Sequence, residues 1–234
     1  MIFIGLDVSK ISTALCVEKN YETLLYNYTS KKNNNIWIKE TNNLINYRHI
    51  EYKYSDIDDY SKSELIKISE FDSITNLILN DILDNIDILD SVKIGIEGYS
   101  YNSKKGPIID IVEFTSILKY KLINKLNKYS NIEILSPISV KSETCKMVYK
   151  PRIEIKGKRV IKEVLHNENS KGKEASKFDK WDMLYALIDS NIHLNLKDWC
   201  KENIDRISKN KEVPKPIDDI IDSVWIKEII KYIK

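Results

Sequence analysis

The sequence predicts an α/β domain in which helices flank a mixed β-sheet. Two observations support this fold class. Short apolar runs typical of strands alternate, along the first part of the chain, with longer segments whose apolar residues recur every three or four positions. Beyond residue 139 the periodicity is helical, with polar breaks. The resulting order of strands, helix, strand, helix, strand and then helices is typical of a sheet that contains parallel pairs.

The N-terminal elements are predicted to form a hairpin followed by a third strand. The apolar run MIFIGLDV is the first strand, and STALCVEKN follows it after the turn-like SKI. Two later runs, YETLLYNY and YRHIEYKY, each fit a third strand, and the sequence does not decide between them. The polar stretch TSKKNNNIWIKETNN between them is predicted to leave the core.

The rest of the chain is predicted to alternate helices with strands. The segment SKSELIKISEFDSITNLILNDILDNI has a capping-type start and helical spacing. The strand VKIGIEGYS follows, then a long helix that starts near Pro107, then the strand IEILSP, which Pro137 ends. Two further helices are predicted in SKFDKWDMLYALIDSNI and, after the polar linker KNKEVPKP, in IDDIIDSVWIKEIIKYIK.

Composition narrows the class of protein. Basic residues number 37 against 35 acidic ones, a net charge of +2, so any nucleic-acid surface has to be local. The three cysteines are widely spaced, which is typical of reduced thiols, and the three histidines form no zinc-type pair. There is no apolar run of about 18 residues and no signal-peptide pattern, so we expect an intracellular, cytoplasmic protein that is not secreted.

Carboxylates at the ends of two predicted strands are the first candidates for chemistry. Asp7 ends the first strand and Glu97 ends the strand VKIGIE. Each has a plain structural explanation, as a turn-forming or a solvated strand end. Carboxylates from neighbouring strands converge at one sheet edge, however, and such a cluster persists only if cations neutralise it. Hard oxygen ligands of this kind suit Mg²⁺ or Mn²⁺.

The last helix opens with three aspartates in PIDDIIDS. Asp222 shares a helical face with Ile226 and Ile229, and Asp219 precedes it by three residues. Because that face continues as an apolar one, we expect these carboxylates to point into the protein. One aspartate is enough to complement a helix N-terminus, so three favour a metal site.

A second pair with the same spacing, Asp179 and Asp182, competes with this one. Asp182 shares its face with Ala186 and Asp189, whereas the apolar stripe that begins at Trp181 lies on the other side. We therefore expect this pair to lie on a solvated helix face.

Four blocks in order along the chain resemble the RuvC-like Holliday junction resolvases of phages and large DNA viruses, within the ribonuclease H-like superfamily. These blocks are IGLDVSKISTAL, IGIEGYSYNSKKG, SPISVK followed by GKEASK, and PIDDIIDS. The resemblance implies a ribonuclease H-like mixed five-stranded sheet and a single nuclease domain over residues 1–234, with insertions near 29–60, 142–170 and 184–216. Each block alone is weak, since GLDVSK also opens a class of DEDD transposases.

The resemblance implies a structure-selective endonuclease that resolves four-way or other branched DNA. Asp7, Glu97, Asp219 and Asp222 are then the catalytic and metal-binding residues, holding two Mg²⁺ or Mn²⁺ ions for phosphodiester hydrolysis. Asp7 is expected to bind both ions. The products are expected to carry 5′-phosphate and 3′-hydroxyl ends. A homodimer is expected, because paired nicks in a two-fold symmetric junction require two sites.

DNA contacts are expected from aromatic and cationic residues near the metals, although a plain polar loop and surface lysines explain the same residues. The expected DNA-binding residues are Tyr99, Tyr101, Lys104, Lys105, Lys141 and Lys177. The basic segment 146–162 is a further candidate, either as a DNA-contacting arm or as a solvated helix.

Three alternatives stay open from sequence alone. They are a flap or branch debranching nuclease, a DEDD transposase-like enzyme and a catalytically inactive DNA-binding relative. A transposase would need a second catalytic or DNA-binding domain, for which 234 residues leave little room, and the presence of all four acids argues against the inactive relative. An actin-like ATPase is disfavoured, because GLDVSKIS lacks a Gly-rich phosphate loop and the chain has only six glycines.

Overall fold

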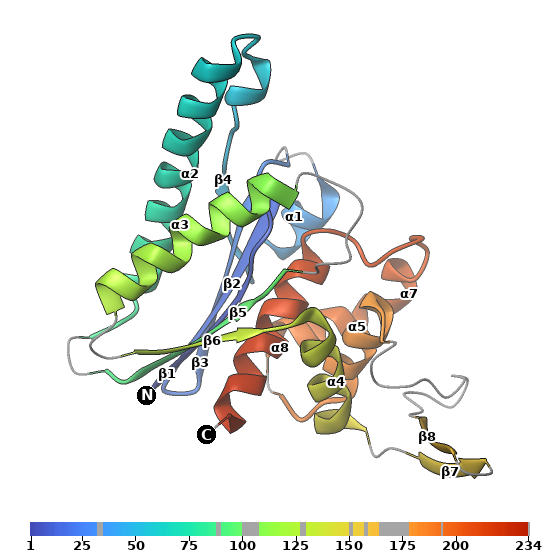
Figure 1. Cartoon of the computed structure of the whole chain (residues 1–234). Helices are drawn as coiled ribbons and strands as arrows, with labels where there is room; N and C mark the ends of the chain where they lie inside the picture. The colour runs from blue at the N-terminus through green and yellow to red at the C-terminus, as the bar shows by residue number, and fades with distance from the viewer. Residues whose placement is uncertain are drawn as a thin grey trace.

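A computed structural model shows a central sheet with helices on both faces (Figure 1). It describes residues 1–31, 35–87, 90–99, 108–126, 130–149, 152–156, 159–163, 178–192 and 194–233. The six strands of the sheet are β1 (Ile2–Asp7), β2 (Ser12–Lys19), β3 (Glu22–Thr29), β4 (Asn46–His49), β5 (Val92–Glu97) and β6 (Ser130–Leu135). They lie in the order β4-β3-β2-β1-β5-β6.

The predicted mixed α/β fold is confirmed, with one strand more than expected. β1, β2 and β3 form an antiparallel meander, whereas β5 and β6 run parallel to β1. Both candidate third strands form. YETLLYNY gives β3, and part of YRHIEYKY gives β4, which pairs in parallel with β3 at the edge of the sheet.

One face of the sheet is covered by α2 (Tyr60–Leu83) and α3 (Ile108–Leu126). Strand alternation sends Ile2, Ile4 and Leu6 of β1 to this side, where they join a core that includes Phe71 and Phe114 from the two helices. The loop between β3 and α2 holds the short helices α1 (Ile36–Thr41) and η1 (Tyr54–Asp56) together with β4.

The opposite face carries the remaining helices. These are α4 (Pro137–Val148), α5 (Lys180–Asp189), α6 (Asn195–Glu202), α7 (Ile204–Ile207) and α8 (Ile217–Tyr232). α8 lies directly on β1, β2 and β5, and it is buried along almost its whole length, including the large side chain of Trp225. A helix buried on all sides positions its polar residues as firmly as its apolar ones.

Glycines at matching positions of β1 and β5 let α8 approach the sheet. Gly5 and Gly95 are paired in the parallel register, and both face α8. A methyl group on Gly5 would collide with the carbonyl oxygen of Ser223 and come within 2.6 Å of the Lys227 nitrogen. A methyl group on Gly95 would instead meet the side-chain ends of Ile226 and Ile230 at 2.7 Å.

We therefore expect Gly5→Ala to lower the free energy of unfolding by about 3 kcal/mol, the upper end of the usual cost of overpacking. Gly95→Ala is the matched control and should cost about 1 kcal/mol, because isoleucine side chains can shift where a helix backbone cannot. Urea denaturation of both variants checks this. Equal midpoints would show that α8 does not lie as close to β1 as described.

The basic segment after α4 is not helical, contrary to the expectation of helices beyond residue 139. β7 (Arg152–Lys156) and β8 (Arg159–Glu163) form an antiparallel two-stranded sheet of their own, which is not hydrogen-bonded to the main sheet (Figure 1). The isoleucines and valine of RIEIK and RVIKE alternate with charged residues over five-residue runs, and this pattern fits strands better than the helix assigned to it.

None of the helices in the described part of the chain combines the length and the apolar character that a membrane crossing requires.

Candidate active site

Asp7 and Glu97 end two neighbouring parallel strands at the same edge of the sheet. The register pairs Leu6 with Ile96, so the two acids are the next residues along adjacent strands. Strand alternation places both on the side that α8 covers, opposite to Ile96 and the rest of the α2–α3 core. Asp7 is buried and Glu97 is partly buried.

The first two turns of α8 add Asp218, Asp219 and Asp222, all of them buried. Pro216 is the N-cap residue of α8, and no side chain in the described part of the chain caps the helix, so none of these aspartates acts as a cap. The predicted inward orientation of Asp219 and Asp222 is confirmed. Five carboxyl groups from segments far apart in sequence thus meet beneath one sheet edge; we call them the acidic cluster.

The carboxyl groups of the acidic cluster disturb one another. Burial raises the pKa of Asp7 well above its ordinary value, and the charges of Glu97, Asp222 and Asp219 raise it further. Burial and Asp222 also raise the pKa of Glu97 to about 6, although a hydrogen bond from Asp7 partly opposes that rise. The pKa of Asp222 is raised, first by burial.

Two buried oxygens of the acidic cluster lack hydrogen-bond partners among the described residues: Oδ1 of Asp218 and Oδ2 of Asp219. Burial and the charge of Asp219 raise the pKa of Asp218 to about 6. A buried carboxylate oxygen without a donor is costly, so its presence points to a missing cation or donor.

Lysines from outside the cluster neutralise part of it. Lys180, the first residue of α5, forms an ion pair with Asp222. Lys215 lies 2.5 Å from Asp219 and 3.7 Å from Asp218. The charge of Lys141 on α4 opposes part of the rise in the pKa values of Glu97 and Asp222, so this predicted DNA-binding lysine is close enough to act on the cluster.

The cluster is not arranged as a finished metal site. Within the described ranges, no three Asp, Glu, His or Cys side chains are set around a common point that would hold a metal ion. Lys180 and Lys215 contact the carboxylates that a cation would need. The donor set nevertheless fits Mg²⁺ or Mn²⁺, because it consists of hard oxygens, outnumbers the three lysines and leaves two buried oxygens without a donor.

The other predicted DNA-binding residues fall into two groups. Tyr99 lies against α3, where its hydroxyl donates to the carbonyl of Val112 at 3.4 Å and the Lys119 ammonium sits 4.8 Å from the ring centroid. The others, namely Tyr101, Lys104, Lys105 and Lys177, lie outside the described residues.

The competing pair Asp179 and Asp182 is not a solvated helix face, and that prediction is wrong for Asp182. Asp179 caps α5, and the Asp182 side chain accepts the Asp179 backbone N–H at 2.8 Å to complete a capping box. Asp182 is buried together with Ala186, because α5 packs against both α4 and α8. The sequence pattern predicted that only the side of α5 that carries Trp181 is buried. The structure covers a second side of this helix as well.

Three members of the site were missed by sequence reasoning: Asp218, Lys180 and Lys215. Asp218 was set aside as a helix-terminal charge. Lys215 carried a usable signal, since it lies four residues before Asp219, the spacing of helical ion pairs. Lys180 lies inside FDKWD, and nothing local connects it with a helix 37 residues further on.

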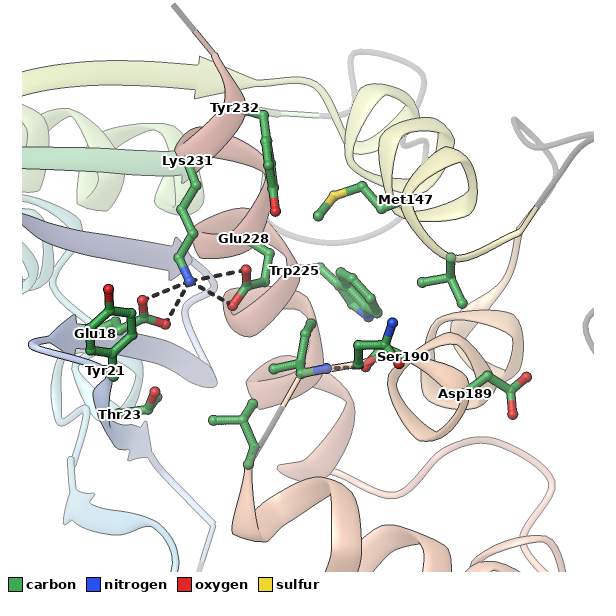
Figure 2. A pocket seen from close by; sticks show the side chains of 14 residues that line it. Glu18, Tyr21, Thr23, Met147, Asp189, Ser190, Trp225, Glu228, Lys231 and Tyr232 are labelled. Carbon is green, nitrogen blue, oxygen red and sulfur yellow. Dashed lines mark hydrogen bonds and ion pairs between the residues drawn. The ribbon is translucent and has the colours of Figure 1, made fainter.

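A cavity of about 510 Å³ lies at the other end of α8 and is a rival location for chemistry (Figure 2). Its charged lining residues already have partners: the Lys231 ammonium lies 2.7 Å from Glu18 and 3.1 Å from Glu228, and Asp189 accepts a hydrogen bond from the Tyr149 hydroxyl. Both glutamates also pair with the fully buried Lys227. These balanced charges hold α8 to β2, and the acidic cluster remains the stronger candidate.

Comparison with known proteins gives one structural likeness. No protein-family model matches the chain, and no curated protein matches it. The crystal structure of a yeast mitochondrial Holliday junction resolvase superposes with a TM-score of 0.46 at 15% sequence identity, covering 98% of this chain and 80% of that one. A likeness at this level does not assign the chain to a family.

Proposed function

We propose that this chain is a metal-dependent endonuclease that cuts branched DNA, four-way junctions in particular. The observation that carries the proposal is the convergence of Asp7, Glu97, Asp219 and Asp222 from two strand ends and one helix. Burial and neighbouring carboxylates raise the pKa values of Asp7 and Glu97, so these acids are costly to keep, which favours a catalytic role over a structural one.

The carboxylates would serve as ligands of two Mg²⁺ or Mn²⁺ ions, which would supply an activated water and stabilise the leaving oxygen, so that products carry 5′-phosphate and 3′-hydroxyl ends. Asp7 is central to this assignment because it is buried and the charges of the three other acids all act on it. Glu97 and Asp222 flank it, and Asp219 adds the fourth carboxylate.

The segment that follows Asp7 is tied to the start of α3, which helps to hold Asp7 in place. Lys10 donates to Asp110 at 2.8 Å, and the Tyr54 hydroxyl donates to the same carboxylate at 2.6 Å. The Tyr52 hydroxyl donates to the Lys10 carbonyl oxygen at 2.7 Å. This network fixes the turn between β1 and β2 without using any carboxylate of the cluster.

We also propose that two copies act together, since two nicks in a two-fold symmetric junction need two sites. The outer side of α3 supports this. Phe114, Leu118 and Leu122 fill the core, while Ile109 and Tyr120 on the other side of the same helix are strongly exposed. Core packing explains the inner stripe, but no described part of the chain covers the outer one.

The test compares nicking of a four-way junction, a Y-fork and a linear duplex of shared sequence. We expect junction cleavage in Mg²⁺, none with EDTA, and at least about tenfold slower cutting of the duplex. Product ends are read by ligation, which requires a 5′-phosphate and a 3′-hydroxyl. Preference for the fork would favour a debranching nuclease, and binding without cleavage in any divalent ion would favour an inactive DNA-binding protein.

A further inference from the structure

We propose that Lys180 and Lys215 are internal counter-ions that occupy the acidic cluster when no divalent cation is bound and must leave it when one binds. This inference rests on the proposed function, because it concerns the same carboxylates. It adds a competition between the protein's own ammonium groups and the metal.

The two lysines contact different aspartates of α8. Lys180 pairs with Asp222. Lys215 takes Asp219 at 2.5 Å and reaches Asp218 at 3.7 Å. Neither lysine belongs to α8 or to the strands that carry the acids, so each arrives from a neighbouring segment, α5 or the linker before α8.

The solvent exposure of the lysine and aspartate side chains indicates which of them moves when a metal ion enters. The Lys180 and Lys215 side chains are 42% and 40% exposed, whereas those of Asp222 and Asp219 are 6% and 3% exposed. The carboxylates are enclosed by protein, whereas both lysine side chains keep a large part of their surface in contact with solvent. An entering cation can therefore displace the ammonium groups into water without moving the backbone.

Lys227 shows the contrasting case within the same chain. It is also held between two carboxylates, Glu18 and Glu228, but its side chain has no exposed surface. That ammonium group is enclosed by protein, so a cation from solvent cannot replace it without displacing the side chains around it. The exposed side chains of Lys180 and Lys215 suit counter-ions that exchange with a metal ion. The buried side chain of Lys227 suits a structural ion pair.

The experiment is titration of Mn²⁺ into the metal-free protein by calorimetry, with wild type, Lys180→Gln and Lys215→Gln. We expect about fivefold tighter Mn²⁺ binding in each variant, because one competing charge is gone. Without metal, each variant should melt at a lower temperature, and Mn²⁺ should raise that temperature more than in wild type. Lys215→Arg keeps the charge and should bind Mn²⁺ as wild type does.

Lys19→Gln is the matched control, since Lys19 also pairs with two carboxylates, Asp87 at 2.5 Å and Asp90 at 3.3 Å, away from the cluster. It should leave Mn²⁺ affinity unchanged. Unchanged or weaker Mn²⁺ binding in both Lys180→Gln and Lys215→Gln, with wild-type binding intact, would overturn the counter-ion role and leave the metal site standing. Absence of binding in wild type and variants alike would overturn the metal site as well.

Discussion

Asp7→Asn is expected to reduce Mg²⁺-dependent junction cleavage by more than about 100-fold. Substituting a residue that only supports a metal ligand usually costs less than this. Asp7→Asn should also raise the melting temperature of the metal-free protein by about 2–4 °C, the shift that 1 kcal/mol produces in a chain of this size. Burial and three neighbouring carboxylates raise the pKa of Asp7, so ionising it opposes folding. An amide keeps the shape and removes the charge.

Asp81→Asn is the matched control. Asp7 and Asp81 are equally buried, at 6% exposure. Asp81, however, accepts from the Tyr28 hydroxyl at 2.8 Å and from Arg48 at 2.9 Å, so its charge is compensated. Its amide variant should melt at a lower temperature and should cleave junctions at the wild-type rate per folded molecule. Because the two aspartates are equally buried, opposite changes in melting temperature would show that repulsion between like charges, and not burial alone, causes the effect at Asp7.

Differential scanning fluorimetry with EDTA and a single-turnover nicking assay provide the two readouts. Nicking by Asp7→Asn at more than a tenth of the wild-type rate would remove Asp7 from the catalytic centre. A lower melting temperature for that variant would show instead that Asp7 stabilises the fold.

The strand-end acids could be predicted from sequence because the signals there are local and regular. A period of two residues assigns Asp7 and Glu97 to the ends of apolar strands, and the parallel relation of those strands follows from the helix between them. Spacing along one helix likewise connected Asp219 with Asp222. These inferences need only the order of the elements and the direction of each strand.

The remainder depends on contacts that no local pattern contains. α8 is buried on nearly all sides, so periodicity could not tell that Asp218 is as enclosed as its neighbours. Asp182 was misjudged for the same reason, since α5 has two covered sides. Lys180 reaches Asp222 across a sequence separation of 42 residues. The pairing of β7 with β8 is a different case, because the alternation in RIEIK and RVIKE is a local signal that was overlooked within a stretch of mostly helical spacing.

Asp219→Asn and Asp218→Asn are expected to differ widely although the two residues are adjacent. Asp219 is close enough to Asp7 for its charge to raise the Asp7 pKa, and Asp218 is not among the main groups that do so. Asp219 also takes the shorter contact with Lys215, 2.5 Å against 3.7 Å. We infer that Asp219 faces the strand-end acids and that Asp218 lies at the margin of the cluster.

Cleavage by Asp219→Asn should therefore fall by more than about 100-fold, whereas Asp218→Asn should keep activity within about tenfold of wild type, as expected for a residue that acts through its neighbours. Single-turnover nicking across a range of Mg²⁺ concentrations measures both. Excess Mg²⁺ should restore Asp218→Asn, because a marginal carboxylate affects ion affinity, but should not restore Asp219→Asn. If Asp218→Asn instead lost more cleavage activity than Asp219→Asn, the metal-binding pair on α8 would be Asp218 and Asp222, which are four residues apart. Asp219 would then serve only as the ion-pair partner of Lys215.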